Sequence, residues 1–282
     1  MAEISAGMVK ELRELTGLPM MECKKALMEC GGDLRKAEEL LRIKGSAKAS
    51  KAASRVAAEG VVGIWLSADE KAGALVELNC ETDFVAKNND FLGFAQSLAE
   101  AVAIRNPKDA AELGSLDLAG SKVEARRQSL VQKIGENISI RRFRRLQAKG
   151  RLAQYLHATK KIGVLVDFDG AEEVGKGLTM HVAFYKPQYL SKANVPADIV
   201  EREREIQKAR AKESGKPPEI AAKMVEGAVN KHLSEITLLG QPYVLNDKES
   251  VEKMLVARKA KIHDYAVLFV GEGIEKPSTS VH

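Results

Sequence analysis

The sequence predicts an α+β protein built from several units, and three observations lead to this expectation. Apolar residues recur at helical spacing near the N-terminus, two stretches alternate as β-hairpins, and one stretch in the C-terminal half is a charged helical hairpin. The chain has 282 residues, enough for two or more domains, and 45% of them are hydrophobic. We therefore expect an N-terminal three-helix unit, two small antiparallel sheets each covered by helices on one side, and a projecting antiparallel coiled-coil hairpin.

The N-terminal stretch, 1–44, predicts three short helices. Ser5 can cap the first helix and Gly17 ends it, and Asp33 can cap the third. Residues 45–59 consist mainly of Ala, Ser and Lys with few large side chains. We interpret 1–44 as a compact unit and 45–59 as a helical linker with little core of its own.

An internal repeat defines the next two units. A shift of ninety positions aligns residues 60–77 with 150–167 and gives seven identities in eighteen positions. We expect a first half at 60–149, a second half at 150–276 and a short tail at 277–282. The predicted strands are 61–66, 74–78 and 138–146 in the first half and 152–156, 164–168 and 265–270 in the second.

The two copies of the repeat differ between their second strand and the helix that follows. The helices align at a shift of 83 positions, which pairs Leu98 with His181, so the first copy carries seven extra residues. These extra residues contain Thr-Asp-Phe-Val at 82–85, whereas the second copy turns through Asp-Gly-Ala at 169–171. The difference predicts a loop in the first half that the second half lacks.

Two interpretations of this loop are open. Phe84 can fold back into the local core while Asp83 caps the helix that begins near Asn89 or Asp90. Alternatively, the loop is exposed and functional. Because the second copy makes the same connection without an acid beside an aromatic ring, the repeat favours the exposed loop.

Residues 196–238 interrupt the second half with the predicted hairpin. Its helices, 198–213 and 219–236, are joined by Ser-Gly-Lys-Pro-Pro at 214–218, a turn that no helix crosses. The predicted contact stripe is narrow, as in a coiled coil, and consists of Ile199, Ile206 and Ala209 against Ile220, Met224 and Val229.

Composition argues against several other classes of protein. Lys and Arg number 44 against 39 Asp and Glu, a mild excess that does not by itself indicate nucleic-acid binding. Cys23, Cys30 and Cys80 fit neither a disulfide framework nor paired metal-ligand spacing, which is typical of reduced cytosolic thiols. The N-terminus lacks a signal-peptide pattern and no segment is apolar enough to span a bilayer. We expect a cytoplasmic protein with no membrane contact.

The sequence gives little support for nucleic-acid binding, metal binding or catalysis. Arg-Arg-Phe-Arg-Arg at 141–145 is the strongest indication of nucleic-acid binding, but strand alternation divides the arginines between two faces and favours a solvated, ion-paired surface. The histidines lie far apart, which argues against a metal site. His157 lies at a hairpin turn and can contact a partner, whereas His181 is expected to pack or hydrogen-bond within its helix. No nucleophile with a base is evident, so we expect no enzyme, cofactor, metal or bound nucleic acid.

Two long motifs carry a family resemblance. Glu-Leu-Asn-Cys-Glu-Thr-Asp-Phe-Val-Ala-Lys at 77–87 resembles a signature of the bacterial elongation factor Ts family. Leu-Arg-Glu-Leu-Thr-Gly at 12–17, continuing into 20–27, resembles that family's opening helical hairpin. Further likeness at 133–138 and 214–217 extends the resemblance over about residues 2–276.

The resemblance implies a function without catalysis by the chain itself. It implies a guanine-nucleotide exchange factor for elongation factor Tu in translation, which binds Tu with GDP, displaces Mg²⁺ and promotes GDP release so that GTP can bind. It also implies that Phe84 wedges beside the partner's Mg²⁺ site and that Asp83 engages the partner, within a contact loop that comprises Thr82, Asp83, Phe84 and Val85.

The resemblance assigns further partner contacts to other parts of the chain. The N-terminal unit, UBA-like in this family, would bind the partner's nucleotide domain, and the second half would bind it elsewhere. The matching positions are Arg13, Met20, Met21, His157, Val244 and Leu245. Because adjacent helical residues cannot both face inward, one of Met20 and Met21 can equally be core. The hairpin can carry contacts in a homodimer or a two-plus-two complex.

Overall fold

The N-terminal region is helical, as the sequence predicts. The computed structural model describes residues 4–118, 120–213 and 217–275. Three helices come first: α1 (Ala6–Thr16), α2 (Met20–Glu29) and α3 (Leu34–Ala52). The Ser5 hydroxyl accepts a hydrogen bond from the Met8 N–H, Gly17 ends α1 in the left-handed conformation with φ of 67°, and the Asp33 carboxylate caps α3. A small core of Leu12, Cys23 and Leu27 holds the three helices together.

Helix α3 continues past the predicted boundary at residue 44. It buries Gly45, Ala49 and Ala52 although residues 45–59 contain few large side chains, so the expectation of little core there is wrong. The physical reason is a close approach to α6 (Val123–Ile134). A Cβ atom at Gly45 would lie 2.4 Å from Oε1 of Gln132, so only small residues permit this spacing.

The first half contains a three-stranded antiparallel sheet. The order is β1 (Glu59–Leu66), β2 (Ala72–Cys80) and β5 (Ser139–Gln147), close to the predicted strands. Helix α4 (Asn89–Arg105) packs its buried Phe91, Phe94 and Leu98 on this sheet. The remaining elements are α5 (Ala110–Ser115), the short strands β3 (Asp117–Leu118) and β4 (Ser121–Lys122), and α6, together with the 3-10 turn η1 (Val85–Lys87).

The second half repeats this arrangement. Its sheet has the order β10 (Lys261–Phe269), β7 (Ile162–Asp169) and β6 (Arg151–Leu156), and α7 (Glu172–Tyr185) packs on β6 and β7. Strand β10 begins four residues before the predicted 265, with a register shift near His263. The other elements are η2 (Lys192–Asn194), η3 (Leu238–Gly240), β8 (Pro242–Tyr243), β9 (Asn246–Ser250) and α10 (Val251–Ala257).

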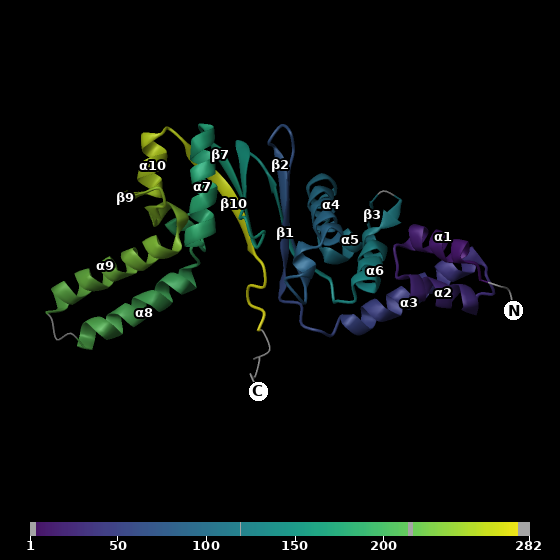
Figure 1. The fold of residues 1–282 in the computed structure, drawn as a ribbon. Coiled ribbons are helices and arrows are strands. Elements are labelled where there is room, and N and C mark those ends of the chain that lie inside the picture. Colours follow the sequence, from purple (N-terminus) through teal and green to yellow (C-terminus); the bar gives the residue numbers. More distant parts are fainter. Residues whose placement is uncertain (1–3, 119, 214–216, 276–282) are drawn as a thin grey trace.

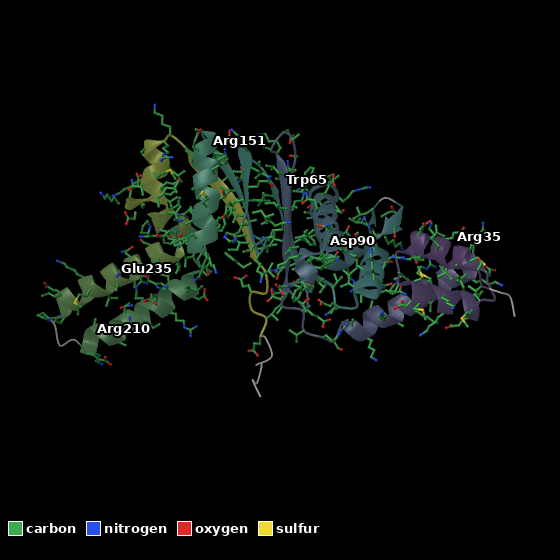
Figure 2. The ribbon with its side chains drawn as sticks, viewed as in Figure 1. Arg35, Trp65, Asp90, Arg151, Arg210 and Glu235 are labelled. Carbon is green, nitrogen blue, oxygen red and sulfur yellow. The ribbon has the colours of Figure 1, made fainter. Side chains whose placement is uncertain are left out.

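The two sheets pack against each other in the middle of the molecule. One apolar cluster includes Val62 and Leu75 of the first sheet and Leu152, Leu165 and Leu268 of the second. Figure 1 shows the sheets side by side, with α4 and α7 on their outer sides. Side chains fill the space between the sheets (Figure 2), whereas the labelled Trp65 packs on the α4 side of the first sheet and Arg151 lies over the Phe168 ring of the second. The α+β class is therefore confirmed, and each sheet covers the other on the face that its helix leaves open.

The helical hairpin projects from the second half, opposite to the N-terminal helices (Figure 1). It consists of α8 (Ala197–Glu213) and α9 (Pro218–Ile236), whereas part of the predicted turn, 214–216, lies outside the described residues, as does the tail at 277–282. The predicted stripe is partly wrong, because Ile206, Ala209, Ile220 and Met224 are exposed. The observed contact is made by Val195, Ala211, Val225, Val229 and Leu233, with Ile199 packed against them.

Candidate functional site

The connection between β2 and α4 presents an aromatic ring to solvent. Phe84 is 80% exposed, so the core interpretation of this side chain is wrong. Asp83 does not cap α4, because the Asn88 side chain accepts hydrogen bonds from the N–H groups of Asp90 and Phe91. Asp83 instead forms an ion pair with Lys87 at 2.7 Å, and this lysine also lies 5.9 Å from the centre of the Phe84 ring.

Glu136 fixes the backbone of this loop. One of its carboxylate oxygens accepts hydrogen bonds from the N–H groups of Glu81 and Thr82, each at 3.0 Å. The other accepts from the Thr82 hydroxyl at 2.6 Å. Bonds to a charged acceptor are stronger than neutral ones, so three of them restrict the loop where it leaves the sheet.

The far side of the loop is anchored by burial. Val85 and Ala86 are 9% and 8% exposed and belong to the core of the first half. Val85 was predicted as part of the contact surface, but its side chain faces the core and serves as an anchor. Phe84 therefore stands between a hydrogen-bonded Thr82 and a buried Val85, which keeps the exposed ring on a restricted backbone.

The segment at 133–138, which carries part of the resemblance, lies against the loop. Arg55 forms an ion pair with Glu81 at 3.2 Å and donates to the Gly135 carbonyl at 3.0 Å. Asn137 donates through its side chain to the Arg55 carbonyl at 2.7 Å. No local pattern in the sequence predicts that Glu136 or Arg55 supports the loop. The only signal for Glu136 was its place in the matched segment.

Electrostatics of the loop agree with this geometry. The hydrogen bond from Lys87 lowers the pKa of Asp83, so its carboxylate is charged at neutral pH. Burial, together with the nearby charges of Glu136 and Glu59, raises the pKa of Cys80 to about 12, so the thiol stays protonated. That thiol donates to the Thr82 carbonyl at 3.1 Å and adds another contact to the start of the loop.

The N-terminal residues predicted to contact a partner are all exposed. Arg13, Met20 and Met21 face solvent, and the exposed fractions of the two methionines are 51% and 64%. The alternative that one of them belongs to the core is wrong, because Cys23, Ala26 and Leu27 occupy the buried face of α2.

The turn that carries His157 lies at the same end of the sheets as the Phe84 loop. Lys160, in this turn, accepts a hydrogen bond at its carbonyl from the Val62 N–H at 2.8 Å, and Lys161 pairs with Glu59 at 2.6 Å. Glu59 lies opposite Cys80 in the β1–β2 register. The structure therefore brings His157 and the loop to one edge, whereas Val244 and Leu245 lie beyond α7, in the outer part of the second half (Figure 1).

His181 packs in the core, which is one of the two expectations for it, and its hydrogen bonds reach outside its helix. The ring is fully buried, and it contacts Gln241 and the backbone of Val244, which lie about sixty residues along the chain. Burial lowers the pKa of His181 to about 4, so the side chain is neutral in the folded protein above that pH.

The arginine-rich strand is ion-paired, but its geometry differs from the prediction. A register shift after Glu77 breaks the alternation of β5, so that Arg141 and Arg142 both reach the fully buried Glu77, at 3.0 and 2.6 Å. Arg145 donates to the Ala103 carbonyl, and Arg144 is exposed. Arg141 and Arg142 therefore share the buried Glu77 as partly exposed partners, instead of standing on opposite faces of the strand.

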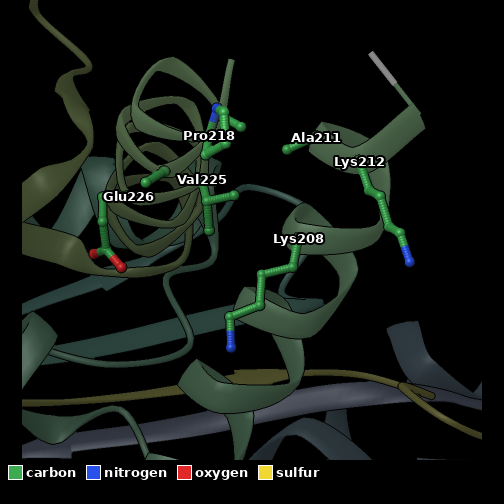
Figure 3. Close-up of a pocket in the computed structure, with 8 residues that line it drawn as sticks. Lys208, Ala211, Lys212, Pro218, Val225 and Glu226 are labelled. Atoms are coloured by element: carbon green, nitrogen blue, oxygen red, sulfur yellow. The ribbon is translucent and has the colours of Figure 1, made fainter. Parts of the chain in front are cut away.

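A cavity of about 450 Å³ lies between α8 and α9 (Figure 3). Ala211, Pro218 and Val225 line it, with Lys208 and Lys212 beside them. It contains none of the residues predicted to bind a partner. Over residues 4–118, 120–213 and 217–275 there is no group of three or more His, Cys, Asp or Glu side chains arranged to hold a metal. In the same ranges no helix is long and apolar enough to cross a bilayer.

Together, the fold and the loop define a protein that presents an anchored surface loop, and not an enclosed pocket, as its most specific feature. Comparison with known proteins gives the family. The model of the family described as elongation factor TS matches residues 81–272. The chain belongs to the elongation factor Ts family.

Relatives from several bacteria match nearly the whole chain. An elongation factor Ts from Azoarcus sp. is 58% identical over 280 residues, which cover 99% of this chain and 94% of the relative. That of Aromatoleum aromaticum is 57% identical over 98% of this chain and 94% of its own length. That of Bordetella petrii is 57% identical over 99% and 95%.

Proposed function

We propose that the chain is a guanine-nucleotide exchange factor for elongation factor Tu. It binds Tu carrying GDP, displaces the Mg²⁺ ion and promotes release of GDP so that GTP can bind. Membership of the elongation factor Ts family supports this proposal. The observation that carries it is the 80% exposed Phe84 ring on a loop fixed at Thr82 and Val85.

The proposed mechanism depends on the strict coordination geometry of Mg²⁺. This ion requires near-ideal octahedral oxygen ligands at about 2.0–2.1 Å, so a small displacement of one ligand weakens its binding. Phe84 inserts beside the partner's Mg²⁺ site, and Asp83 exchanges its ion pair with Lys87 for polar groups of the partner. The anchored backbone matters because a mobile loop would move aside when the ring meets resistance.

Binding and nucleotide affinity are linked in both directions. A factor that weakens nucleotide binding to Tu must itself be bound less tightly when nucleotide is present. GTP therefore expels the factor after GDP has left. In this mechanism the chain makes and breaks no covalent bond and requires no cofactor.

Further contacts would hold the partner in place. Arg13, Met20 and Met21 of the unit 1–44 contact its nucleotide domain, and Val244 and Leu245 contact it at a second position. His157 contributes beside the loop. The projecting hairpin, 196–238, mediates a homodimer or a two-plus-two complex, and the factor acts in the cytoplasm, where translation takes place.

A nucleic-acid-binding function is less well supported. Arg141 and Arg142 are engaged with the buried Glu77, and a third arginine of this strand is bonded to a carbonyl. Of the four arginines in 141–145, Arg144 alone is classed as exposed. One exposed guanidinium is a poor basis for a phosphate-binding surface, which needs several cations on one face.

The test is release of a fluorescent GDP analogue from purified Tu with and without this chain. Phe84→Ala is expected to lower the maximal release rate by tenfold or more, which corresponds to about 1.4 kcal/mol or more in activation free energy. Phe184→Ala is the matched control, because Phe184 is 70% exposed on α7 and far along the chain from the loop. That variant should release GDP at the unchanged rate.

Chelation of Mg²⁺ distinguishes displacement of the metal from other effects. With the metal removed by the chelator, the displacement step has already occurred, so the defect of Phe84→Ala should shrink. A defect that persists at full size in chelator would exclude the wedge mechanism. Failure of the unaltered chain to release GDP at all would exclude the exchange function.

A further inference from the structure

The turn that presents Leu245 is tied to α7 by a buried histidine. The N–H of Val244 donates to Nδ1 of His181 at 3.2 Å, and Nε2 of the same ring lies 3.0 Å from Oε1 of Gln241. Gln241 in turn donates from Nε2 to the Glu235 carbonyl at 2.7 Å, at the end of α9. The chain of contacts therefore links α7, the turn and the base of the hairpin.

These contacts permit one protonation state of the ring. A backbone N–H can only donate, so Nδ1 must be the acceptor and Nε2 must carry the hydrogen. Nε2–H then donates to Oε1 of Gln241, which leaves the Gln241 amide group to donate to Glu235, as observed. A doubly protonated ring would place a donor against the Val244 N–H and break the first contact.

Packing restricts the same turn further. The His181 ring stacks on Tyr185, with ring centres 4.8 Å apart, and on the fully buried Tyr243 at 6.1 Å. Tyr243 lies so close to Gly177 that a Cβ atom there would come within 1.8 Å of the tyrosine hydroxyl. Tyr243 is thus inserted against α7, and the next residues are forced outward, with Leu245 58% exposed.

We propose that His181 is a positioning residue for partner binding, which holds the Val244 backbone so that Leu245 points to the partner. This rests on the proposed function, in which Leu245 contacts elongation factor Tu. His181 itself is fully buried and touches no partner. Its effect on exchange must therefore pass through Leu245, which gives the proposal a specific test.

The experiment measures GDP release as a function of factor concentration, for the full chain with His181→Leu, Leu245→Ala and the double variant. His181→Leu should raise the half-saturating concentration about tenfold, since one buried N–H loses its acceptor, and should leave the maximal rate unchanged. Leu245→Ala should raise it as well. The half-saturating concentration of the double variant should not exceed that of the more affected single variant, because both changes disable the same contact.

Two further variants separate positioning from general damage. His181→Asn offers a carbonyl oxygen near the place of Nδ1, so it should restore most of the affinity. His263→Leu, on β10, is the matched histidine control and should behave as the unaltered chain, because His263 belongs to no proposed partner contact. Should His181→Leu fail to fold, Gln241→Met removes the Nε2 partner without altering α7 and should shift the half-saturating concentration in the same direction.

The possible outcomes are distinct. The positioning function would be overturned if the increases in half-saturating concentration multiplied in the double variant. It would also be overturned if His181→Asn raised this concentration as much as His181→Leu. No effect of Leu245→Ala would also overturn it, while GDP release that still depends on Phe84 would leave the exchange function intact. Protection of the Val244 amide from hydrogen exchange, lost in His181→Leu and kept in His181→Asn, is the expected spectroscopic result.

Discussion

The first half of the molecule joins β2 to α4 through residues 81–88, whereas the second half joins β7 to α7 through residues 170 and 171 alone. The short connection passes through Gly170, whose φ of 141° suits glycine and whose missing Cβ leaves room for Ala260. Its only side chain is the methyl group of Ala171, so this connection presents no large side chain to solvent. The long connection has eight residues, and it keeps both its ends fixed while it exposes Phe84.

This difference shows how a repeated fold can carry function in one copy. Both copies need a strand, a helix and a turn between them, and the second copy contains little more than these. The first copy adds residues whose backbone is held by Glu136 and by the burial of Val85. The additional residues leave the sheet order unchanged. In both halves, a β-hairpin is joined by one later strand, which pairs with the second strand of the hairpin.

The comparison is tested most strongly by truncating one phenylalanine in each half. Phe168, at the end of β7, is 1% exposed and packs against Gly175, so Phe168→Ala should cost about 3–5 kcal/mol in the free energy of unfolding. Phe84→Ala should cost little, because an exposed ring leaves no cavity. Denaturant titration of the two variants measures the difference. Similar losses for both would mean that the Phe84 ring is buried in solution.

The halves also place a buried acid at equivalent positions of the second strand. Glu77 aligns with Asp167, and both are at most 2% exposed. Asp167 accepts from the backbone N–H groups of Lys149 and Gly150, at 2.8 and 3.0 Å. Glu77 accepts from the Gly271 N–H at 2.8 Å and, in addition, from two guanidiniums. Each acid therefore ties its strand to the segment that follows the last strand of the other half.

The two acids should differ in the cost of neutralisation. Burial raises the pKa of Glu77, but the hydrogen bonds from Gly271, Arg142 and Arg141 outweigh it, and the net pKa is lowered. Glu77→Gln removes the buried anion from Arg141 and leaves Arg142 with only the exposed Glu272 as an anionic partner, so we expect a loss of about 3 kcal/mol in the free energy of unfolding. Asp167→Asn leaves only neutral N–H groups, and we expect about 1 kcal/mol.

Denaturant titration of both variants, with Arg144→Gln as an exposed-arginine control, checks this order. Arg144→Gln should change the free energy of unfolding by less than about 0.5 kcal/mol. An equal loss for Glu77→Gln and Asp167→Asn would show that the arginines obtain sufficient hydration at their exposed ends, and that the pairing with Glu77 adds no stability.

The sequence predicts the parts of this fold that depend on local pattern. The hairpins follow from alternation, the N-terminal caps from Ser5 and Asp33, and the exposed loop from the unequal spacing of the two copies. The predicted contact stripe of α8 and α9 is partly wrong, because α8 faces α9 in part through half-buried polar residues such as Arg204, which pairs with Glu226 of α9 at 3.2 Å. A search for large apolar residues at helical spacing selects Ile206 in their place.

Long-range contacts explain why the rest of the site was missed. Glu136 accepts a hydrogen bond from Thr82, which lies 54 residues earlier in the chain, and no local pattern in α6 or β5 predicts this contact. The sequence predicts that His181 packs or hydrogen-bonds within its helix; it does pack there, but its hydrogen-bond partners Gln241 and Val244 are brought to it by the path of the chain after α9. The continuation of α3 was likewise hidden, because Gly45 and its neighbours pack by close approach instead of by large side chains.

A smaller expected effect concerns acid stability, and it again separates the halves. His181 aligns with Leu98, and both are fully buried, so one copy has a titratable group where the other has an apolar one. The folded-state pKa of His181 is about 4, below the ordinary value of 6.5. Between these pH values the unfolded chain binds a proton at His181 that the folded protein does not. Stability contributed by the neutral ring is therefore complete above pH 6.5 and is lost as the pH falls toward 4.

Carboxylates with lowered pKa, such as Glu77, lose their contribution only below about 4.5, so the window from pH 6.5 to 4.5 isolates the histidine. Between pH 7.5 and 4.8 the unaltered chain should lose about 2 kcal/mol more in the free energy of unfolding than His181→Leu, which copies the first-half residue. Denaturant titration at both pH values measures this, and His181→Asn serves as a second non-titrating variant. The same pH dependence in all three proteins would show that the folded-state pKa of His181 is not lowered, and hence that the contact between Nδ1 and the Val244 N–H stabilises the turn less than its geometry indicates.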